Sequence, residues 1–145
     1  MKFKKIGLAS DHAGYEKKEI IKNHLSKNGF EVMDFGTHST ESVDYPDFAH
    51  PLANAIETNK CDVGIAICGT GNGINMTLNK HPEIRSALCW NCEIAKLSRA
   101  HNNANICSLP ARFISDEMAI EIVYIFLSTD FEGGRHSVRV NKIAF

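Results

Sequence analysis

The sequence predicts one α/β domain, a three-layer αβα sandwich around a five-stranded parallel sheet. The chain has 145 residues, a length typical of a single domain with one hydrophobic core. Short aliphatic or β-branched runs alternate with longer amphipathic segments from end to end, which is typical of βαβ units. No Pro/Ser-rich linker, charge block or internal repeat interrupts this alternation, so we expect residues 1–145 to form one domain.

The apolar runs supply the expected strands, and the amphipathic segments supply the helices. The strands are expected at residues 4–9, 30–34, 62–68, 85–90 and 104–108. The helices are expected at residues 15–27, 47–58, 72–80, 91–100 and 115–128. Asn28-Gly29 is typical of a helix C-cap and ends the first helix, and a short terminal helix is expected after Gly133-Gly134.

The expected strand order is 2-1-3-4-5. Right-handed crossovers place helices on both faces of such a sheet, and its ligand crevice opens at the carboxyl ends of the strands. In this order the crevice lies between the first and third strands. The loops that emerge there are residues 10–14 and 68–73, which also contain the most chemically active side chains.

The charge balance excludes several kinds of partner. Lys+Arg 16 and Asp+Glu 17 give a formal net charge of -1, so we expect no binding to nucleic acid or to an anionic membrane. No apolar run is long enough to span a bilayer, and the basic start lacks the apolar region of a signal peptide. Five cysteines without the density of a disulfide scaffold indicate reduced thiols, and hence a cytoplasmic protein.

The loop Cys68-Gly69-Thr70-Gly71-Asn72-Gly73 is suited to an anion. Its glycines let the backbone turn sharply and present N–H groups just before a helix. It lacks the Lys of a P-loop, and its GxGxG spacing differs from the dinucleotide pattern GxGxxG. A cysteine phosphatase would have Arg where Ile74 stands, six residues after Cys68. The loop therefore predicts an anion site, and its spacing disfavours a nucleotide as the ligand.

Cys68 itself allows two interpretations. A thiol at a strand end, beside the positive end of a helix dipole, can form a thiolate that acts as a base. The alternative is an ordinary buried strand cysteine, which is the usual fate of a free Cys in an α/β core. The pair Cys89 and Cys92 has the spacing of half a zinc site, but the sequence has no second pair, so we expect no metal site.

Five segments together carry a resemblance to a known family: Ser10-Asp11-His12-Ala13-Gly14, Asp44-Tyr45-Pro46-Asp47, Ile67-Cys68-Gly69-Thr70-Gly71-Asn72-Gly73-Ile74, Leu97-Ser98-Arg99-Ala100-His101-Asn102-Asn103-Ala104-Asn105 and Glu132-Gly133-Gly134-Arg135-His136. In their order and spacing, over residues 5–140, they resemble the type B ribose-5-phosphate isomerases, also called the ribose/galactose isomerase family. The resemblance implies a Rossmann-like sheet, no metal and no organic cofactor. It also implies a homodimer or dimer of dimers with active sites shared between subunits.

The resemblance further implies a reaction and the residues that perform it. Ribose 5-phosphate and ribulose 5-phosphate, of the non-oxidative pentose phosphate pathway, would interconvert through a cis-enediolate. Some members of the family use a Glu at the position of Ile74 as the base. Ile74 cannot take a proton, so Cys68 would be the base here. Thr70 and Asp11 would handle the hydroxyl protons. His101 would open the sugar ring as a general acid.

The remaining implied roles concern binding. The substrate contacts would be His12, Tyr45, Gly69, Gly71, Asn72, Gly73, Asn102, Arg112, Arg135 and Arg139. Arg135 and Arg139 are spaced i, i+4, which places both on one helix face where guanidinium groups can bind a phosphate. Pro110-Ala111 replaces the glycine-containing turn that usually precedes the family's arginine, so Arg112 is expected to point differently.

Two other functions remain open at this stage. One is an isomerase of the same family that acts on allose 6-phosphate or galactose 6-phosphate. The other is a sugar-phosphate-binding module without turnover, because a fold by itself does not determine a function.

Overall fold

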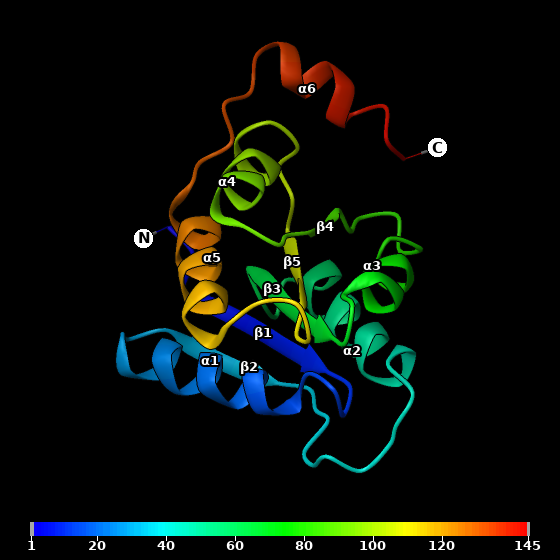
Figure 1. Cartoon of the computed structure of the whole chain (residues 1–145). Coiled ribbons are helices and arrows are strands. Elements are labelled where there is room, and N and C mark those ends of the chain that lie inside the picture. The colour runs from blue at the N-terminus through cyan, green and yellow to red at the C-terminus, as the bar shows by residue number, and fades with distance from the viewer. Residues whose placement is uncertain (1, 145) are drawn as a thin grey trace.

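The computed structural model describes residues 2–144, which form a five-stranded parallel sheet covered by helices on both faces, as expected (Figure 1). The strands are β1 (Lys5–Ser10), β2 (Glu31–Asp34), β3 (Val63–Cys68), β4 (Ser86–Leu88) and β5 (Ile106–Pro110). The helices are α1 (Tyr15–Lys27), α2 (Pro46–Glu57), α3 (Asn72–Leu78), α4 (Cys92–Ala100), α5 (Asp116–Ser128) and α6 (Arg135–Val140). The predicted α/β sandwich is confirmed, and within residues 2–144 no helix combines the length and the apolar character needed to cross a membrane.

The strand order is β2-β1-β3-β5-β4, so the expected order of the last two strands was wrong. The reason is burial. β5 is buried along its whole length and pairs with β3, whereas β4 has three half-buried residues and lies at the edge. Central strands of a parallel sheet are covered on both faces, which favours the more apolar run Ile106–Pro110 there. The crevice between β1 and β3 is unaffected by the exchange.

Two apolar clusters hold the helices to the sheet. One cluster joins Ile6, Leu8 and Ile65 to α1, α4 and α5, and the other joins Ala9 and Ala66 to α2 and α3. Along β1 the side chains alternate between the two clusters, as the pleat requires. Helix α6 differs from the other five because none of its residues is buried, and Figure 1 shows it beyond α4, away from the sheet.

Candidate active site

A pocket of about 520 Å³ lies at the carboxyl ends of β1 and β3, where the sequence predicts the crevice. Its lining includes most of the predicted site residues: Asp11, His12, Tyr45, Cys68, Gly69, Thr70, Gly73 and Arg112. The pocket therefore places a thiol, a carboxylate, a hydroxyl, an imidazole and a guanidinium around one space.

The loop after β1 positions Asp11 against the end of β3. The backbone N–H of Asp11 donates to the Ile67 carbonyl at 3.3 Å, and the Gly14 N–H donates to Asp11 Oδ1 at 3.1 Å. A Cβ on Gly14 would lie 2.6 Å from the Ile67 carbonyl oxygen, so the close approach requires glycine. Asp11 is consequently buried with one carboxylate oxygen already hydrogen-bonded.

His12 is oriented by the loop between β2 and α2. The backbone N–H of Val43 donates to His12 Nδ1 at 3.1 Å. Because an amide N–H can only donate, Nδ1 is the acceptor and the neutral ring carries its proton on Nε2. That Nε2–H is then able to donate to an anion in the pocket.

Cys68 is the last residue of β3 and is 4% exposed. Arg112 is anchored beside it, because the Arg112 N–H donates to the Gly69 carbonyl at 3.0 Å and its guanidinium lies over Gly69. A Cβ on Gly69 would lie 3.3 Å from Arg112 Nη1. Pro110 pairs with Cys68 at the end of the sheet, so the stiffer turn still delivers Arg112 to the pocket.

The glycine loop leaves several backbone donors unused. Within residues 2–144, no acceptor is present for the N–H groups of Gly69, Thr70, Gly71 and Gly73, whereas the Asn72 N–H donates to Thr70 Oγ1 at 3.2 Å. Gly71 has a φ of 76°, which favours glycine, and it shapes the turn together with Asn72 instead of lining the pocket.

Tyr45 closes the pocket over this loop. A Cβ on Gly73 would lie 2.5 Å from Tyr45 Cζ, so the aromatic ring packs directly on the glycine. Tyr45 precedes α2, and the N–H of Ala49 donates to its carbonyl at 3.0 Å, which fixes the start of that helix.

The other four predicted site residues do not line this pocket. His101 follows α4 as its C-cap, and Asn102 lines a separate hollow of about 320 Å³. Arg135 and Arg139 lie exposed on α6. One chain thus presents two separate groups of predicted site residues.

Around His101 lies a cluster that the sequence did not predict. His101 Nε2 and His136 Nε2 are 3.8 Å and 3.6 Å from Glu132 Oε1, and the two imidazole rings stack with centroids 4.2 Å apart at 12°. The three side chains offer ligand atoms within 4.8 Å of one another. Stacked rings hold their nitrogen lone pairs in parallel planes, however, so they do not converge on one ion as metal ligands must. The only advance signal was the segment Glu132–His136 itself.

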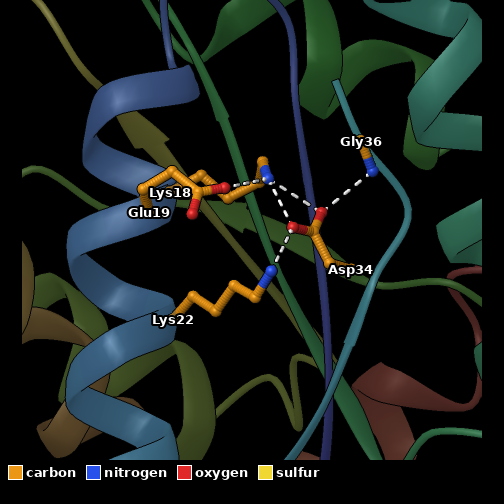
Figure 2. Close-up of polar contacts among 5 residues, drawn as sticks. All are labelled: Lys18, Glu19, Lys22, Asp34 and Gly36. Atoms are coloured by element: carbon orange, nitrogen blue, oxygen red, sulfur yellow. Dashed lines mark hydrogen bonds and ion pairs between the residues drawn. The ribbon is translucent and has the colours of Figure 1, made fainter. Parts of the chain in front are cut away.

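A buried ion pair between Lys18 and Asp34 joins α1 to the end of β2 (Figure 2). Lys18 Nζ from α1 donates to both oxygens of Asp34, at 2.8 and 2.7 Å, and the Gly36 N–H donates to Asp34 Oδ1 at 2.9 Å. Burial opposes ionisation of Asp34, but the hydrogen bonds from Lys18, Gly36 and Lys22 together lower its pKa. The Gly36 carbonyl in turn accepts from Ser10, the residue before Asp11, so the pair fixes the loops that carry the site.

A larger hollow of about 800 Å³ lies at the opposite, amino-terminal edge of the sheet. Arg85 Nε there donates to the Asn103 carbonyl at 2.9 Å, and Arg99 Nη1 donates to Asn103 Oδ1 at 3.0 Å. These arginines thus hold the turn after His101. The carboxyl edge remains the better candidate, because parallel sheets bind ligands there and the thiol and free N–H groups lie there.

Comparison with known proteins identifies the family to which the chain is similar. The family model described as Ribose/Galactose Isomerase matches residues 6–143. Ribose-5-phosphate isomerase B of Escherichia coli is 43% identical over 140 residues, covering 97% of this chain and 94% of the relative. A ribose 5-phosphate isomerase structure from Thermotoga maritima is 51% identical with a TM-score of 0.96, covering 99% of each chain.

A third comparison includes a ligand. The structure of ribose-5-phosphate isomerase B from Mycoplasma genitalium with bound ribulose-5-phosphate is 44% identical, with a TM-score of 0.93, and covers 99% of this chain and 95% of that one. The matches extend over nearly the full chain and include every segment of the candidate site. The chain therefore belongs to the ribose/galactose isomerase family.

Proposed function

We propose that this protein interconverts ribose 5-phosphate and ribulose 5-phosphate through a cis-enediolate, without a metal ion. The observation that carries the proposal is the pocket in which Cys68, Asp11 and Thr70 surround one space with His12 and Arg112. A relative that is 44% identical has been solved with bound ribulose-5-phosphate, and this supports the choice of sugar.

Cys68 is the proposed base. Its thiolate takes the proton from C2 of the open-chain aldose, the C–H electron pair forms the C1–C2 double bond, and the C1 carbonyl oxygen becomes an oxyanion. Return of the proton to C1 and transfer of the O2 proton to the O1 oxyanion complete the ketose. Thr70 and Asp11 line the same pocket and are the candidates for moving the hydroxyl proton.

The glycine loop is the proposed oxyanion site. The N–H groups of the pocket residues Gly69, Thr70 and Gly73 have no acceptor within residues 2–144, so they can donate to charge that develops on O1 or O2. Donors that are already in place cost no reorganisation during the reaction. They would supply the charge stabilisation that other isomerases obtain from a metal ion.

The proposed site is completed by a second subunit. His101, Asn102, Arg135 and Arg139 lie outside the pocket of their own chain, and α6 has no buried residue. Val138 on α6 is 58% exposed, Leu97 near the end of α4 is 36% exposed, and Phe113 beside Arg112 is 73% exposed. Apolar side chains therefore flank both groups of site residues, as a homodimer or dimer of dimers with shared sites requires.

In this arrangement the substrate phosphate lies between the subunits. His12 and Arg112 contact it from one chain, and Arg135 and Arg139 contact it from the other. His101 protonates the ring oxygen of the closed sugar while the C1–O bond breaks and the anomeric hydroxyl releases its proton to water. Asn102 binds a sugar hydroxyl. A cytoplasmic, single-domain enzyme is part of the same proposal.

Activity of the purified chain on a panel of sugars tests the proposal. With excess EDTA present, we expect conversion of ribose 5-phosphate at least tenfold faster, in kcat/KM, than of allose 6-phosphate or galactose 6-phosphate, because one misfitted carbon costs about 1–3 kcal/mol. Preference for a six-carbon sugar would reassign the substrate. No turnover of any of the three, with binding retained, would favour the non-catalytic module.

A further inference from the structure

The cluster of His101, Glu132 and His136 contains two side chains to which no role has yet been given. Glu132 Oε1 lies at the edge of both imidazoles, 3.8 Å from His101 Nε2 and 3.6 Å from His136 Nε2. His136 covers the face of His101, with the ring centroids 4.2 Å apart and the planes 12° from parallel. His101 thus has a carboxylate near its edge, at ion-pair distance, and an aromatic ring packed on its face.

The backbone fixes these contacts. The Glu132 N–H donates to the Ala100 carbonyl at 3.0 Å, and Ala100 is the residue before His101. The His136 N–H donates to the Gly133 carbonyl at 3.1 Å, and both Gly133 and Gly134 have positive φ, which lets the chain turn back over His101. Arg99 Nε also donates to the Thr129 carbonyl at 3.2 Å, so the segment is tied to α4 at two points.

The charged groups around the two imidazole rings affect His101 and His136 differently. Partial burial lowers the pKa of His136, with further lowering from His101, Arg135 and Arg139, and Glu132 only partly opposes this. His136 is therefore disposed to remain neutral, since two stacked imidazolium ions would repel each other. A neutral ring stacks favourably on a cation, and a carboxylate stabilises an adjacent imidazolium. His136 is thus suited to stack on His101, and Glu132 is placed to face the charge that a protonated His101 carries.

We propose that Glu132 and His136 are positioning residues for His101: Glu132 stabilises its protonated form for ring opening, and His136 fixes the plane of its ring. The inference rests on the proposed function, in which His101 is the ring-opening acid. It predicts that the two residues act on ring opening and leave the proton transfer at Cys68 unchanged.

Two reactions separate these steps. Conversion of ribose 5-phosphate requires ring opening, because that sugar is mostly a closed furanose. Exchange of a C1 hydrogen of ribulose 5-phosphate with D₂O does not, because its C5 oxygen carries the phosphate and cannot close a five-membered ring. The exchange therefore reports on the base and the enediolate alone.

The test compares Glu132→Gln, Glu132→Asp and the wild type, with Glu93→Gln as the control, since Glu93 is an exposed acid on α4, the helix that His101 caps. We expect Glu132→Gln to lower conversion roughly tenfold, a part of the 10²–10⁴ that a general acid contributes, and to leave C1 exchange within about twofold. Glu132→Asp restores most of the conversion, and Glu93→Gln changes neither reaction.

The proposed role of His136 is tested by comparing a variant that keeps a flat ring at this position with one that removes it. His136→Phe keeps a flat ring against His101 and is expected to convert ribose 5-phosphate faster than His136→Ala, with equal C1 exchange in both. Equal losses of conversion and exchange in Glu132→Gln, or unchanged conversion, would overturn the inference. Absence of conversion by the wild type would overturn the proposed function instead, so the two failures are distinguishable.

Discussion

Lys18 and Asp34 form an ion pair in which the lysine side chain is fully buried and the carboxylate is 9% exposed. The pair joins α1 to the end of β2 (Figure 2), and it is linked through Gly36 to Ser10 beside the pocket loop. Neither residue belongs to the predicted site, because the contact depends on how a helix packs against a neighbouring strand.

Asp34→Asn is expected to destabilise the fold by about 3 kcal/mol at pH 7, because it leaves the buried Lys18 ammonium with only Glu19, which is 3.1 Å away and partly exposed, as its counter-charge. The pKa of Asp34 is lowered in the folded state, so its contribution is present above the unfolded value of about 4 and is lost as pH falls through the lower folded value. Urea unfolding of both proteins at pH 7 and pH 3 should therefore give a smaller difference at pH 3. An equal difference at both pH values would contradict this role.

Gly73→Ala is expected to raise the KM for ribose 5-phosphate and to cost about 1–3 kcal/mol of stability. The added Cβ would lie 2.5 Å from the Tyr45 ring, so the ring must move away from the pocket. Steady-state kinetics and thermal unfolding measure the two effects. The double variant with Tyr45→Ala removes the clash, and we expect the Gly73→Ala substitution to cost little stability in that background. Additive losses would show that the clash is not the cause.

Mixed dimers test the shared site. Cys68→Ala and the double variant Arg135→Ala/Arg139→Ala are each expected to be inactive alone, but a mixture of unfolded and refolded chains should recover roughly a quarter of wild-type activity. Half of the random dimers are mixed, and each mixed dimer has one intact site of two. If all site residues acted within one chain, the mixture would stay inactive.

Much of the fold follows from the sequence because strands and helices leave periodic signals. The runs that became β1 and β3 and the cap at Asn28-Gly29 were predicted close to their observed places. The order of β4 and β5 was not, because both runs are short and apolar and only their packing decides which is central.

In the site, too, contacts between sequence neighbours could be predicted and contacts between distant segments could not. Cys68, Gly69 and Thr70 are neighbours in the sequence, so one loop brings them into the pocket together. Glu132 and His136 reach His101 across about 30 residues of chain, and nothing in local sequence reports such a contact. In the proposed dimer His101 meets Cys68 across two chains, and no periodic pattern of strands or helices within one sequence marks such a contact.

The most direct test of the account is exchange of the C2 hydrogen of ribose 5-phosphate with D₂O by the wild type and by Cys68→Ala, with excess EDTA in both. Calorimetric titration with the sugar phosphate checks that the variant still binds. We predict rapid exchange by the wild type and none by Cys68→Ala, with similar affinity, because the anion-binding groups remain and only the base is lost. Exchange by Cys68→Ala at the wild-type rate would contradict the assignment of Cys68 as the base.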